Sequence, residues 1–293
     1  MATPPISLCL IVRNEEANLP ACLAPLVGLV DEVVVVDTGS TDATRQVATR
    51  LGARVVDFPW VDSFAAARNE ALRQADGDWV LWLDADDRID EVNRSRLQAV
   101  LAGLREEEVA YLMWTRLLWS SGRSTTVDHV RLFRKRPQVR WKYRVHEQLL
   151  WGEDWLAIQA RPSEVVFEHL GYQDAGQMRR KEERNLRLLE LDLPDHPEDS
   201  FLLFNLGWTN LRLGRRAEAL PALQRCLQQV QPNLSYVRKL HLLLMQTLEE
   251  LGRPQEALAV CLEARKRYPQ DAEFLSHEQR LRSLSGMVVV RGW

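Results

Sequence analysis

The first part of the chain alternates short apolar runs with polar segments of helical length. This βαβα pattern is typical of an α/β fold, in which a mostly parallel sheet is covered by helices. The runs expected to form strands are Ile6–Val12, Glu32–Val36, Arg54–Phe58 and Trp79–Leu83. Ligands of such sheets bind beyond the carboxyl ends of the strands. The segments to examine for a site are therefore Arg13–Glu16, Asp37–Ser40, Pro59–Asp62 and Asp84–Asp87.

Two of the intervening helices have recognisable starts. Side chains of Ser, Thr and Asp accept hydrogen bonds from the unpaired amides of a first helical turn. We expect Ser40 or Thr41 to cap a helix that runs through Leu51. In the same way, we expect Asp62 or Ser63 to cap a helix through residue 75.

The pattern changes between about residues 105 and 170, where strand-like runs follow one another without helical spacers. The runs are Val109–Leu117, His129–Arg134, Val139–Tyr143 and Ser163–His169. An antiparallel or mixed extension of the sheet is the simplest interpretation. A helix from Ala175 to Leu191 is expected to follow.

Beyond residue 198 the pattern is helical and repeats internally. Leu213-Gly214-Arg215 recurs as Leu251-Gly252-Arg253, and in both copies a Glu-Ala-Leu segment follows. A helix, a turn centred on glycine and a second helix resemble the tetratricopeptide (TPR) repeat. Fewer than three full repeats rarely stand alone, so we expect this all-α region to pack on the preceding domain or on another copy of itself. Its extended surface would also suit a protein partner.

Composition and charge exclude several classes of protein. Of the 293 residues, 46% are apolar and 27% are charged, as in folded globular proteins. The 38 Lys and Arg against 41 Asp and Glu give a formal charge of -3, which provides no field to attract nucleic acid or an anionic membrane. No apolar run is long enough to cross a bilayer, and no basic signal segment is recognisable, so we expect a cytoplasmic protein.

Two common types of binding motif are missing from the sequence. None of the four cysteines forms a Cys-x-x-Cys pair, so neither a zinc site nor a disulfide framework is indicated. The 14 glycines include no Gly-x-Gly and no Gly-x4-Gly-Lys loop, which excludes dinucleotide-binding and P-loop proteins.

The strongest chemical signal is Asp84-Ala85-Asp86-Asp87, directly after the apolar run Trp79–Leu83. In an extended segment, residues two apart point to the same side, so Asp84 and Asp86 can converge on one ligand. Two aligned carboxylates repel unless a cation lies between them. A divalent cation that also binds a diphosphate satisfies this requirement, although a solvated turn is the commoner role for such a motif.

Four ordered motifs resemble the family 2 glycosyltransferases of the GT-A fold. They are Ser7–Glu16, Val33–Asp42, Ala67-Arg68-Asn69 and Gly77–Asp87. A looser resemblance continues through Arg131–Arg134, Val145-His146-Glu147 and Phe167–Tyr172. The resemblance implies a Rossmann-like catalytic domain, here joined to TPR-like repeats.

The resemblance also implies how the nucleotide-sugar donor is bound. Asn14, Glu15 and Asp37 would line the pocket for the base and ribose, usually those of uridine. Asp37 could instead cap the turn that follows it. Arg68 would approach the diphosphate, with a surface ion pair to Glu70 or a neighbouring acid as the alternative.

Metal ligands follow from the same resemblance. Asp84 would contact ribose or metal, and Asp86 would ligate the metal, Mn²⁺ or Mg²⁺. His169 lies where GT-A enzymes often place a histidine that completes the metal shell. A purely structural histidine is the alternative at this position.

The acceptor side is expected around residues 141–147. The same resemblance makes Glu147 the candidate catalytic base, because His146-Glu147 lies where family members place an acidic residue facing the acceptor. Sugar transfer with inversion needs a carboxylate to take the proton of the attacking hydroxyl or thiol. An ion pair with Arg144 or Lys142 is its alternative role. His146 and Trp141 are expected on the acceptor side, where an aromatic ring can stack on a sugar.

The sequence therefore predicts an inverting, metal-dependent glycosyltransferase. Its catalytic domain is expected over residues 1–175, and a linker helix and TPR-like domain over 176–293. The donor is expected to be a UDP-sugar, and the acceptor a glycan, peptide or protein. Two other functions remain open at this point: a TPR scaffold with an inactive GT-A domain, and a nucleotidyltransferase.

Overall fold

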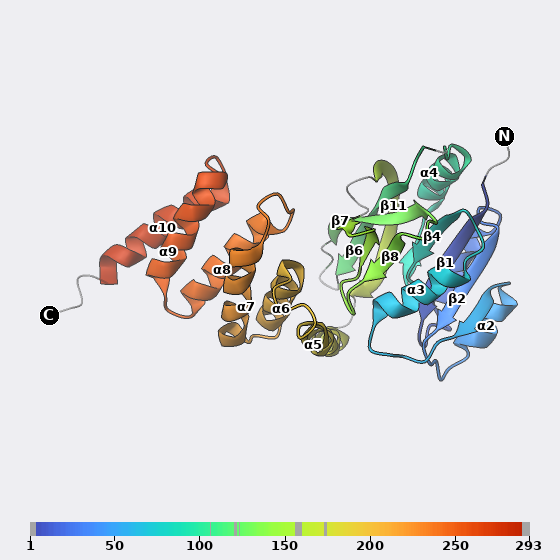
Figure 1. Ribbon diagram of the computed structural model, residues 1–293, viewed down its shortest axis with the longest axis horizontal. Coiled ribbons are helices and arrows are strands. Elements are labelled where there is room, and N and C mark those ends of the chain that lie inside the picture. Colours follow the sequence, from blue (N-terminus) through green and yellow to red (C-terminus); the bar gives the residue numbers. More distant parts are fainter. Residues whose placement is uncertain are drawn as a thin grey trace. The chain divides into compact units, whose positions relative to one another are not determined.

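The chain forms two compact units, Met1–Met178 and Arg179–Trp293. The computed structural model describes residues 4–105, 107–119, 122, 124–155, 160–172 and 175–288. The first unit contains a sheet and its covering helices, and the second consists of helices (Figure 1). Helix α5 (Ala175–Asp192) crosses the boundary between the units.

An eight-stranded sheet forms the centre of the first unit. Its strands lie in the order β3 (Arg54–Asp57), β2 (Glu32–Asp37), β1 (Ile6–Val12), β4 (Trp79–Leu83), β7 (Ser124–Arg134), β6 (Ala110–Trp119), β11 (Arg161–Tyr172) and β5 (Asp87–Arg88). The first four are parallel, as the βαβα pattern predicts. The others are joined by antiparallel and parallel pairs, so this half of the sheet is mixed.

One predicted strand does not join the main sheet. β8 (Val139–Lys142) pairs instead with β9 (Gln148–Trp151), which pairs with β10 (Asp154–Trp155) to make a separate three-stranded sheet. β8 is held on α3 (Phe64–Gln74) by side-chain hydrogen bonds to the backbone of Trp141. Strand periodicity does not reveal such a contact, so the expectation of a single extended sheet was wrong for this segment.

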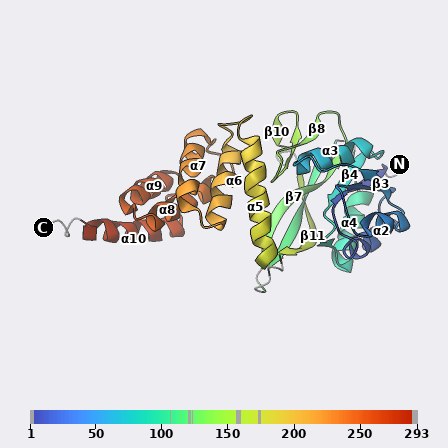
Figure 2. The ribbon, with the colours of Figure 1, turned by 90° about the horizontal axis from the view of Figure 1, so that it is seen from below.

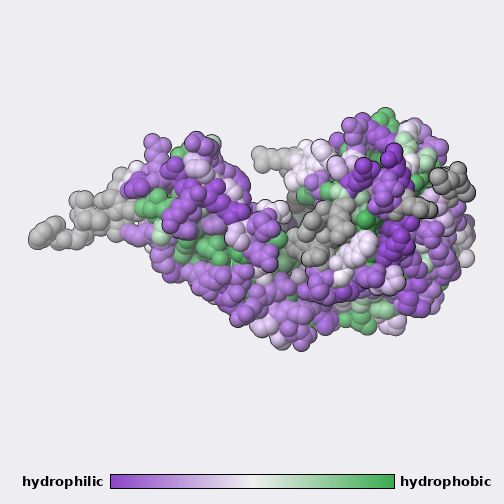
Figure 3. All heavy atoms as spheres, turned by 45° about the horizontal axis from the view of Figure 1, so that its top comes forward, coloured by the Kyte–Doolittle hydropathy of each residue, from purple (hydrophilic) through white to green (hydrophobic). Residues whose placement is uncertain are grey.

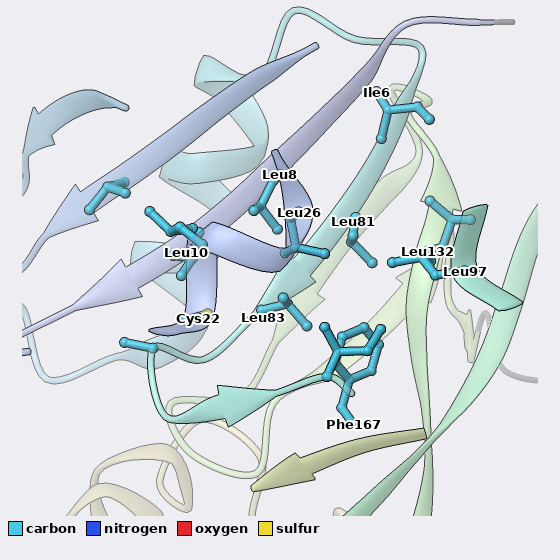
Figure 4. Packing of buried hydrophobic residues seen from close by; sticks show 14 of the residues in the cluster. Ile6, Leu8, Leu10, Cys22, Leu26, Leu81, Leu83, Leu97, Leu132 and Phe167 are labelled. Carbon is cyan, nitrogen blue, oxygen red and sulfur yellow. The ribbon is translucent and has the colours of Figure 1, made fainter. Parts of the chain in front are cut away.

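Both faces of the main sheet are covered, which is why β1, β2 and β4 are almost continuously apolar. On one face, leucines of β1 and β4 pack with helices α1 (Leu19–Leu23), η1 (Ala24–Leu26), α2 (Thr44–Arg50) and α4 (Glu91–Ala102). Leu81, Leu83 and Phe167 point into this core (Figure 4). The alternate residues Val80 and Trp82 face the other side, where α3 lies (Figure 2).

The two predicted helix starts had different outcomes. Ser63 caps α3, and its Oγ accepts a hydrogen bond from the amide of Ala66 at 3.1 Å, as expected. The predicted cap at Ser40 or Thr41 was wrong, because α2 begins only at Thr44. Asp42 accepts the hydrogen bond of the Thr44 amide at 3.0 Å, while Ser40 bonds to Asp37 instead.

The second unit has the predicted helical repeats. Its helices after α5 are α6 (Ser200–Arg212), α7 (Arg216–Gln229), α8 (Val237–Glu250), α9 (Pro254–Arg267) and α10 (Ala272–Val288). The turns from α6 to α7 and from α8 to α9 pass through Gly214 and Gly252 at φ of 78° and 73°. This left-handed conformation costs glycine little, which explains why the Leu-Gly-Arg turn recurs.

Hydrophilic side chains cover most of the molecular face drawn in Figure 3. Within the described part of the chain, no helix combines the length and the apolar composition that crossing a membrane requires.

Candidate active site

The Asp84–Asp87 segment forms a tight turn at the carboxyl end of β4. The amide of Asp87 donates to the carbonyl of Asp84 at 3.0 Å, and the amide of Asp84 donates to Oδ2 of Asp87 at 2.9 Å. The turn leads straight into β5, which pairs antiparallel with β11 and places Asp87 opposite His169. β5 has only two residues, but its pairing with β11 brings the acidic motif next to a histidine that lies 82 positions after Asp87 in the chain.

Four potential ligand groups meet at this turn. One ligand atom each from Asp84, Asp86, Asp87 and His169 can be chosen so that all lie within 4.8 Å of one another. Nδ1 of His169 is 3.0 Å from Oδ1 of Asp87 and 3.3 Å from Oδ1 of Asp86. The structure therefore brings together the three residues that the sequence suggested for the metal site, and adds Asp87.

Asp87 and Arg131 form a buried ion pair that the sequence analysis did not assign. Nη1 of Arg131 is 2.5 Å from Oδ2 of Asp87, and the two side chains are 1% and 0% exposed. Nη2 of Arg131 donates to Oγ1 of Thr115 at 2.9 Å. The sequence does contain a sign of this buried charge, because Arg131 is the one charged residue in the otherwise apolar run from Val130 to Phe133.

A β-bulge places Arg131 at the site. β6 and β7 pair Tyr111 with Leu132 and Leu112 with Val130, so Arg131 is the extra residue between them. Such an insertion redirects a side chain that would otherwise follow the strand alternation. Its guanidinium lies 4.3 Å from the ring centroid of Trp82, and this cation–π contact helps to hold the buried Arg131 side chain in place.

The acids of the turn differ in charge state because their surroundings differ. Burial by itself would raise the pKa of Asp84, but the charges of Arg68 and Arg131 outweigh it and hold this pKa well below its ordinary value. Burial raises the pKa of Asp86 to about 6, and the negative charges of Asp84 and Asp87 oppose the effect of His169. No arginine or lysine of the described chain lies within ion-pair distance of Asp86.

The donor set suits a hard divalent cation. Carboxylate oxygens with an imidazole are ligands that Mn²⁺ accepts, and Mg²⁺ sites are built from one or two carboxylates. A carboxylate hydrogen-bonded to the ring is also a usual partner of a metal-binding histidine, and Oδ1 of Asp87 lies 3.0 Å from Nδ1 of His169. A cation beside Asp86 would relieve the repulsion that raises its pKa.

Arg68 of α3 joins the acidic turn to the predicted base. Its Nη2 is 2.9 Å from Oδ1 of Asp84, and its Nε is 2.6 Å from Oε1 of Glu147. The side chain is only 7% exposed. The alternative pair with Glu70 does not form, because Glu70 bonds to Arg73. Arg68 is therefore the buried centre of a three-residue ion-pair network.

The acceptor-side residues lie on β8 and on the loop between β8 and β9. Glu147 is 14% exposed and bonds to Arg68, whereas Arg144, one of its two predicted alternative partners, donates to the carbonyl of Asp62 at 3.2 Å. His146 is partly buried in the same loop, and its carbonyl accepts a hydrogen bond from Gln148. Trp141 is only 7% exposed and packs edge-on against Trp82, so little of its ring is open to a sugar.

The loops expected to hold the nucleoside are fastened to one another. Oδ1 of Asn14 accepts a hydrogen bond from the amide of Thr41 at 2.8 Å, and the amide of Asn14 donates to Oγ of Ser40 at 2.9 Å. The amide of Glu15 donates to Oγ1 of Thr44 at 2.7 Å. The loop after β1 and the loop after β2 thus form one connected rim at the carboxyl ends of their strands.

Asp37 lies at the end of β2 and is 2% exposed. Its carboxylate accepts hydrogen bonds from both the amide and the hydroxyl of Ser40. This is the turn-stabilising contact that the sequence analysis named as the alternative to ligand binding. The two roles are compatible, because a carboxylate has more acceptor sites than the turn uses.

Backbone strain is concentrated around the same region. The described non-glycine residues with positive φ are Asn14 (57°), Asp62 (57°), Tyr143 (75°) and His146 (56°). All four lie in the loops after β1 and β3 and between β8 and β9, which carry or contact the candidate residues. Such conformations persist only where surrounding contacts impose them, and they are common at binding and catalytic sites.

A surface hollow of about 610 Å³ lies away from this cluster. Gly77, Asp78 and Lys135 are part of its wall, at the amino end of β4. The acidic turn follows the opposite, carboxyl end of the same strand. Position and chemistry therefore select the acidic turn as the candidate site.

The fold and the site define a class of protein. A mostly parallel sheet with a mixed extension, and an acidic turn at the carboxyl end of a central strand, are the architecture of a GT-A glycosyltransferase domain. Residues 7–152 match the sequence profile of glycosyl transferase family 2. Residues 202–233 and 238–280 each match a tetratricopeptide repeat profile. Residues 7–152 thus form a glycosyltransferase family 2 domain, and TPR repeats follow it in the chain.

Two relatives match this chain over most of its length. A TPR repeat-containing protein of Synechococcus elongatus is 37% identical over 253 residues, which are 82% of this chain and 61% of that protein. The glycosyltransferase SunS of Bacillus subtilis, derived from prophage SPbeta, is 26% identical over 234 residues, 77% of this chain and 54% of SunS. The chain therefore spans between one half and two thirds of the length of these relatives.

Part of the chain is similar to a solved structure of glucosyl-3-phosphoglycerate synthase from Mycobacterium tuberculosis. That structure is a complex with Mn²⁺, UDP and glucosyl-3-phosphoglycerate. The match is 31% identical and covers 39% of this chain and 44% of that protein, with a TM-score of 0.32.

Proposed function

We propose that this protein transfers a sugar from a nucleotide-sugar donor, a UDP-sugar, to a hydroxyl or thiol acceptor with inversion at the anomeric carbon. The observation that carries the proposal is the convergence of Asp84, Asp86, Asp87 and His169 at the end of β4, inside a family 2 glycosyltransferase domain. Each of these residues offers a ligand suited to the divalent cation that such a donor needs.

The donor would lie across the carboxyl ends of the strands. Asn14, Glu15 and Asp37 would contact the uracil and ribose, since they line the joined loops after β1 and β2. Asp86 and His169 would hold Mn²⁺ or Mg²⁺, with Asp84 reaching the ribose or the cation. When bound, the cation supplies charge neutralisation for the departing diphosphate.

Glu147 would act as the catalytic base. Its carboxylate would accept the proton of the acceptor while the acceptor oxygen or sulfur attacks the anomeric carbon and the sugar–phosphate bond breaks. The partly buried position of Glu147 limits the water that competes for it. His146, beside it in the loop, would face the acceptor, and Trp141 would contribute through its backbone and through the packing of Arg68.

The TPR repeats would bind a protein partner, an acceptor polypeptide or a second copy of the chain. Stacked helical repeats provide an extended surface suited to such contacts. We propose this binding role in addition to the transfer reaction, not in place of it.

The proposal can be tested with the purified chain, a panel of UDP-sugars and either Mn²⁺ or a chelator. We expect calorimetry to detect binding of UDP in the presence of Mn²⁺, and UDP release to be lost in Asp86→Ala. Glu168→Gln is a matched control, because Glu168 lies next to His169 but forms only a half-exposed pair with Arg116. A wild-type chain that does not bind UDP with Mn²⁺ would contradict the proposal and favour a scaffold with an inactive domain.

Glu147→Gln separates the base from the donor site. We expect this variant to bind UDP and Mn²⁺ as the wild type does, while transfer falls about 10²–10⁴-fold, the usual contribution of a general base. Steady-state transfer rates and calorimetric titration measure the two effects. Unchanged transfer in this variant would remove Glu147 from the mechanism.

A further inference from the structure

Arg68 occupies an unusual position for an arginine near a diphosphate site. Its guanidinium lies near two aromatic rings, 4.2 Å from the centroid of Trp82 and 5.2 Å from that of Trp141. Its Nε and Nη2 are directed at Glu147 and Asp84 at 2.6 and 2.9 Å. The side chain thus has two carboxylate partners and two aromatic neighbours before any ligand binds.

The charges of this network do not favour an anion. The single positive charge of Arg68 is shared by two carboxylates, so the three groups together carry a net negative charge. A diphosphate that approached Arg68 would have to displace one of these acids from a buried contact. Such a displacement leaves a partly buried carboxylate without its charge partner, which costs free energy.

α3 also fixes the backbone that carries Glu147. The Asn69 side chain donates to the carbonyl of Trp141 at 2.9 Å and accepts from its amide at 2.8 Å. At the start of the same helix, the amide of Phe64 donates to the carbonyl of Arg144 at 2.8 Å. These bonds hold the segment from 141 to 144, and the contact with Arg68 extends this attachment to the side chain of Glu147.

We infer that Arg68 is a positioning residue, which sets the carboxylate of Glu147 relative to Asp84 instead of binding the diphosphate. The inference rests on the proposed function, in which Glu147 is the base and Asp84 belongs to the donor site. A planar guanidinium can bind two carboxylates in fixed directions, which the point charge of a lysine does not. Arg68 therefore maintains a defined separation between the donor-binding acid and the base, which would otherwise repel each other.

The inference predicts that Arg68 and Glu147 act as one unit. Arg68→Met should lower kcat for transfer about 10–100-fold, as is typical when the partner of a reacting side chain is removed. The double variant with Glu147→Gln should be no slower than Glu147→Gln alone, to within about 2-fold, because residues that act together have non-additive effects. UDP affinity in Mn²⁺ should stay within about 2-fold of the wild type.

Two further variants make the test specific. Arg73→Met removes an exposed arginine of the same helix, whose side chain bonds only to Glu70 among the described residues, so its kcat should equal that of the wild type. Arg68→Lys keeps the charge but not the fork, and we expect its kcat to lie between those of the wild type and Arg68→Met. Multiplying rate losses in the double variant, or a loss confined to UDP affinity, would overturn the inference and make Arg68 a diphosphate ligand.

Hydrogen exchange provides a readout that does not require turnover. In Arg68→Met and Arg68→Lys, amides of the segment 143–148 should exchange faster than in the wild type, while the Arg73→Met chain should match the wild type. Unchanged exchange in both Arg68 variants would also overturn the inference. A wild-type chain that does not bind UDP with Mn²⁺ would instead refute the proposed function, so the two failures can be told apart.

Discussion

The buried pair between Arg131 and Asp87 allows a sharp test of how the site is held together. In Arg131→Met, Asp87 would remain in a fully buried position with its charge uncompensated. Its other hydrogen-bond contacts, from the amide of Asp84 at 2.9 Å and with His169 at 3.0 Å, do not replace a full positive charge. Removing one partner of a buried ion pair costs about 3–5 kcal/mol, so we expect a loss of this size in the free energy of unfolding.

The neighbouring strand offers a control with the same chemistry and a different burial. Arg116 bonds to Glu168 at 3.1 Å, but the two side chains are 46% and 43% exposed. Exposed pairs contribute about 0–1 kcal/mol, so Arg116→Met should change stability little. The comparison isolates burial, because both arginines leave a carboxylate behind when they are replaced.

Urea unfolding followed by tryptophan fluorescence and circular dichroism measures both variants. The two units can unfold separately, so the transition of the first unit is the one to compare. Adding Asp87→Asn to Arg131→Met should recover part of the loss, since the unpaired charge is then gone. Equal losses in Arg131→Met and Arg116→Met would refute the argument that the buried pair supports the site.

Three further predictions concern single contacts. Burial and neighbouring acids raise the pKa of Asp86 to about 6 from an ordinary value of 3.8. Ionisation of Asp86 therefore lowers the free energy of unfolding of the metal-free protein as the pH rises from about 4 to 6. In thermal melts at neutral pH without metal, Asp86→Asn should therefore be more stable than the wild type by on the order of 1 kcal/mol, and the gain should vanish below about pH 4. A gain that persists there would contradict this origin. Ser63→Ala should lower stability by about 1 kcal/mol through loss of the α3 cap, whereas Ser40→Ala, expected from sequence to remove a cap, should not shorten α2. Gly214→Ala forces alanine into a left-handed conformation and should destabilise the second unit by about 1–2 kcal/mol in urea unfolding; a neutral effect would mean that the turn rearranges.

Local patterns in the sequence were enough to predict the main elements of the fold. Apolar runs identified β1 and β4 to the residue, because strands buried on both faces are continuously apolar. The repeated Leu-Gly-Arg turn identified the helical hairpins, since a left-handed residue ends the first helix of each. The misplaced start of α2 shows the limit of this approach, because Ser40 has a competing partner in Asp37.

Only the tertiary structure decided which charged side chains meet. Arg131 and Asp87 are 44 positions apart, and Arg68 and Glu147 are 79 apart. Their contacts depend on the strand order, on the bulge at Arg131 and on the docking of β8 against α3. Periodicity reports which face of an element is buried, but it does not report what lies across from that face. The acidic turn could thus be located from the sequence alone. Its arginine partners, and the separate sheet formed by β8, β9 and β10, could be identified only from the folded chain.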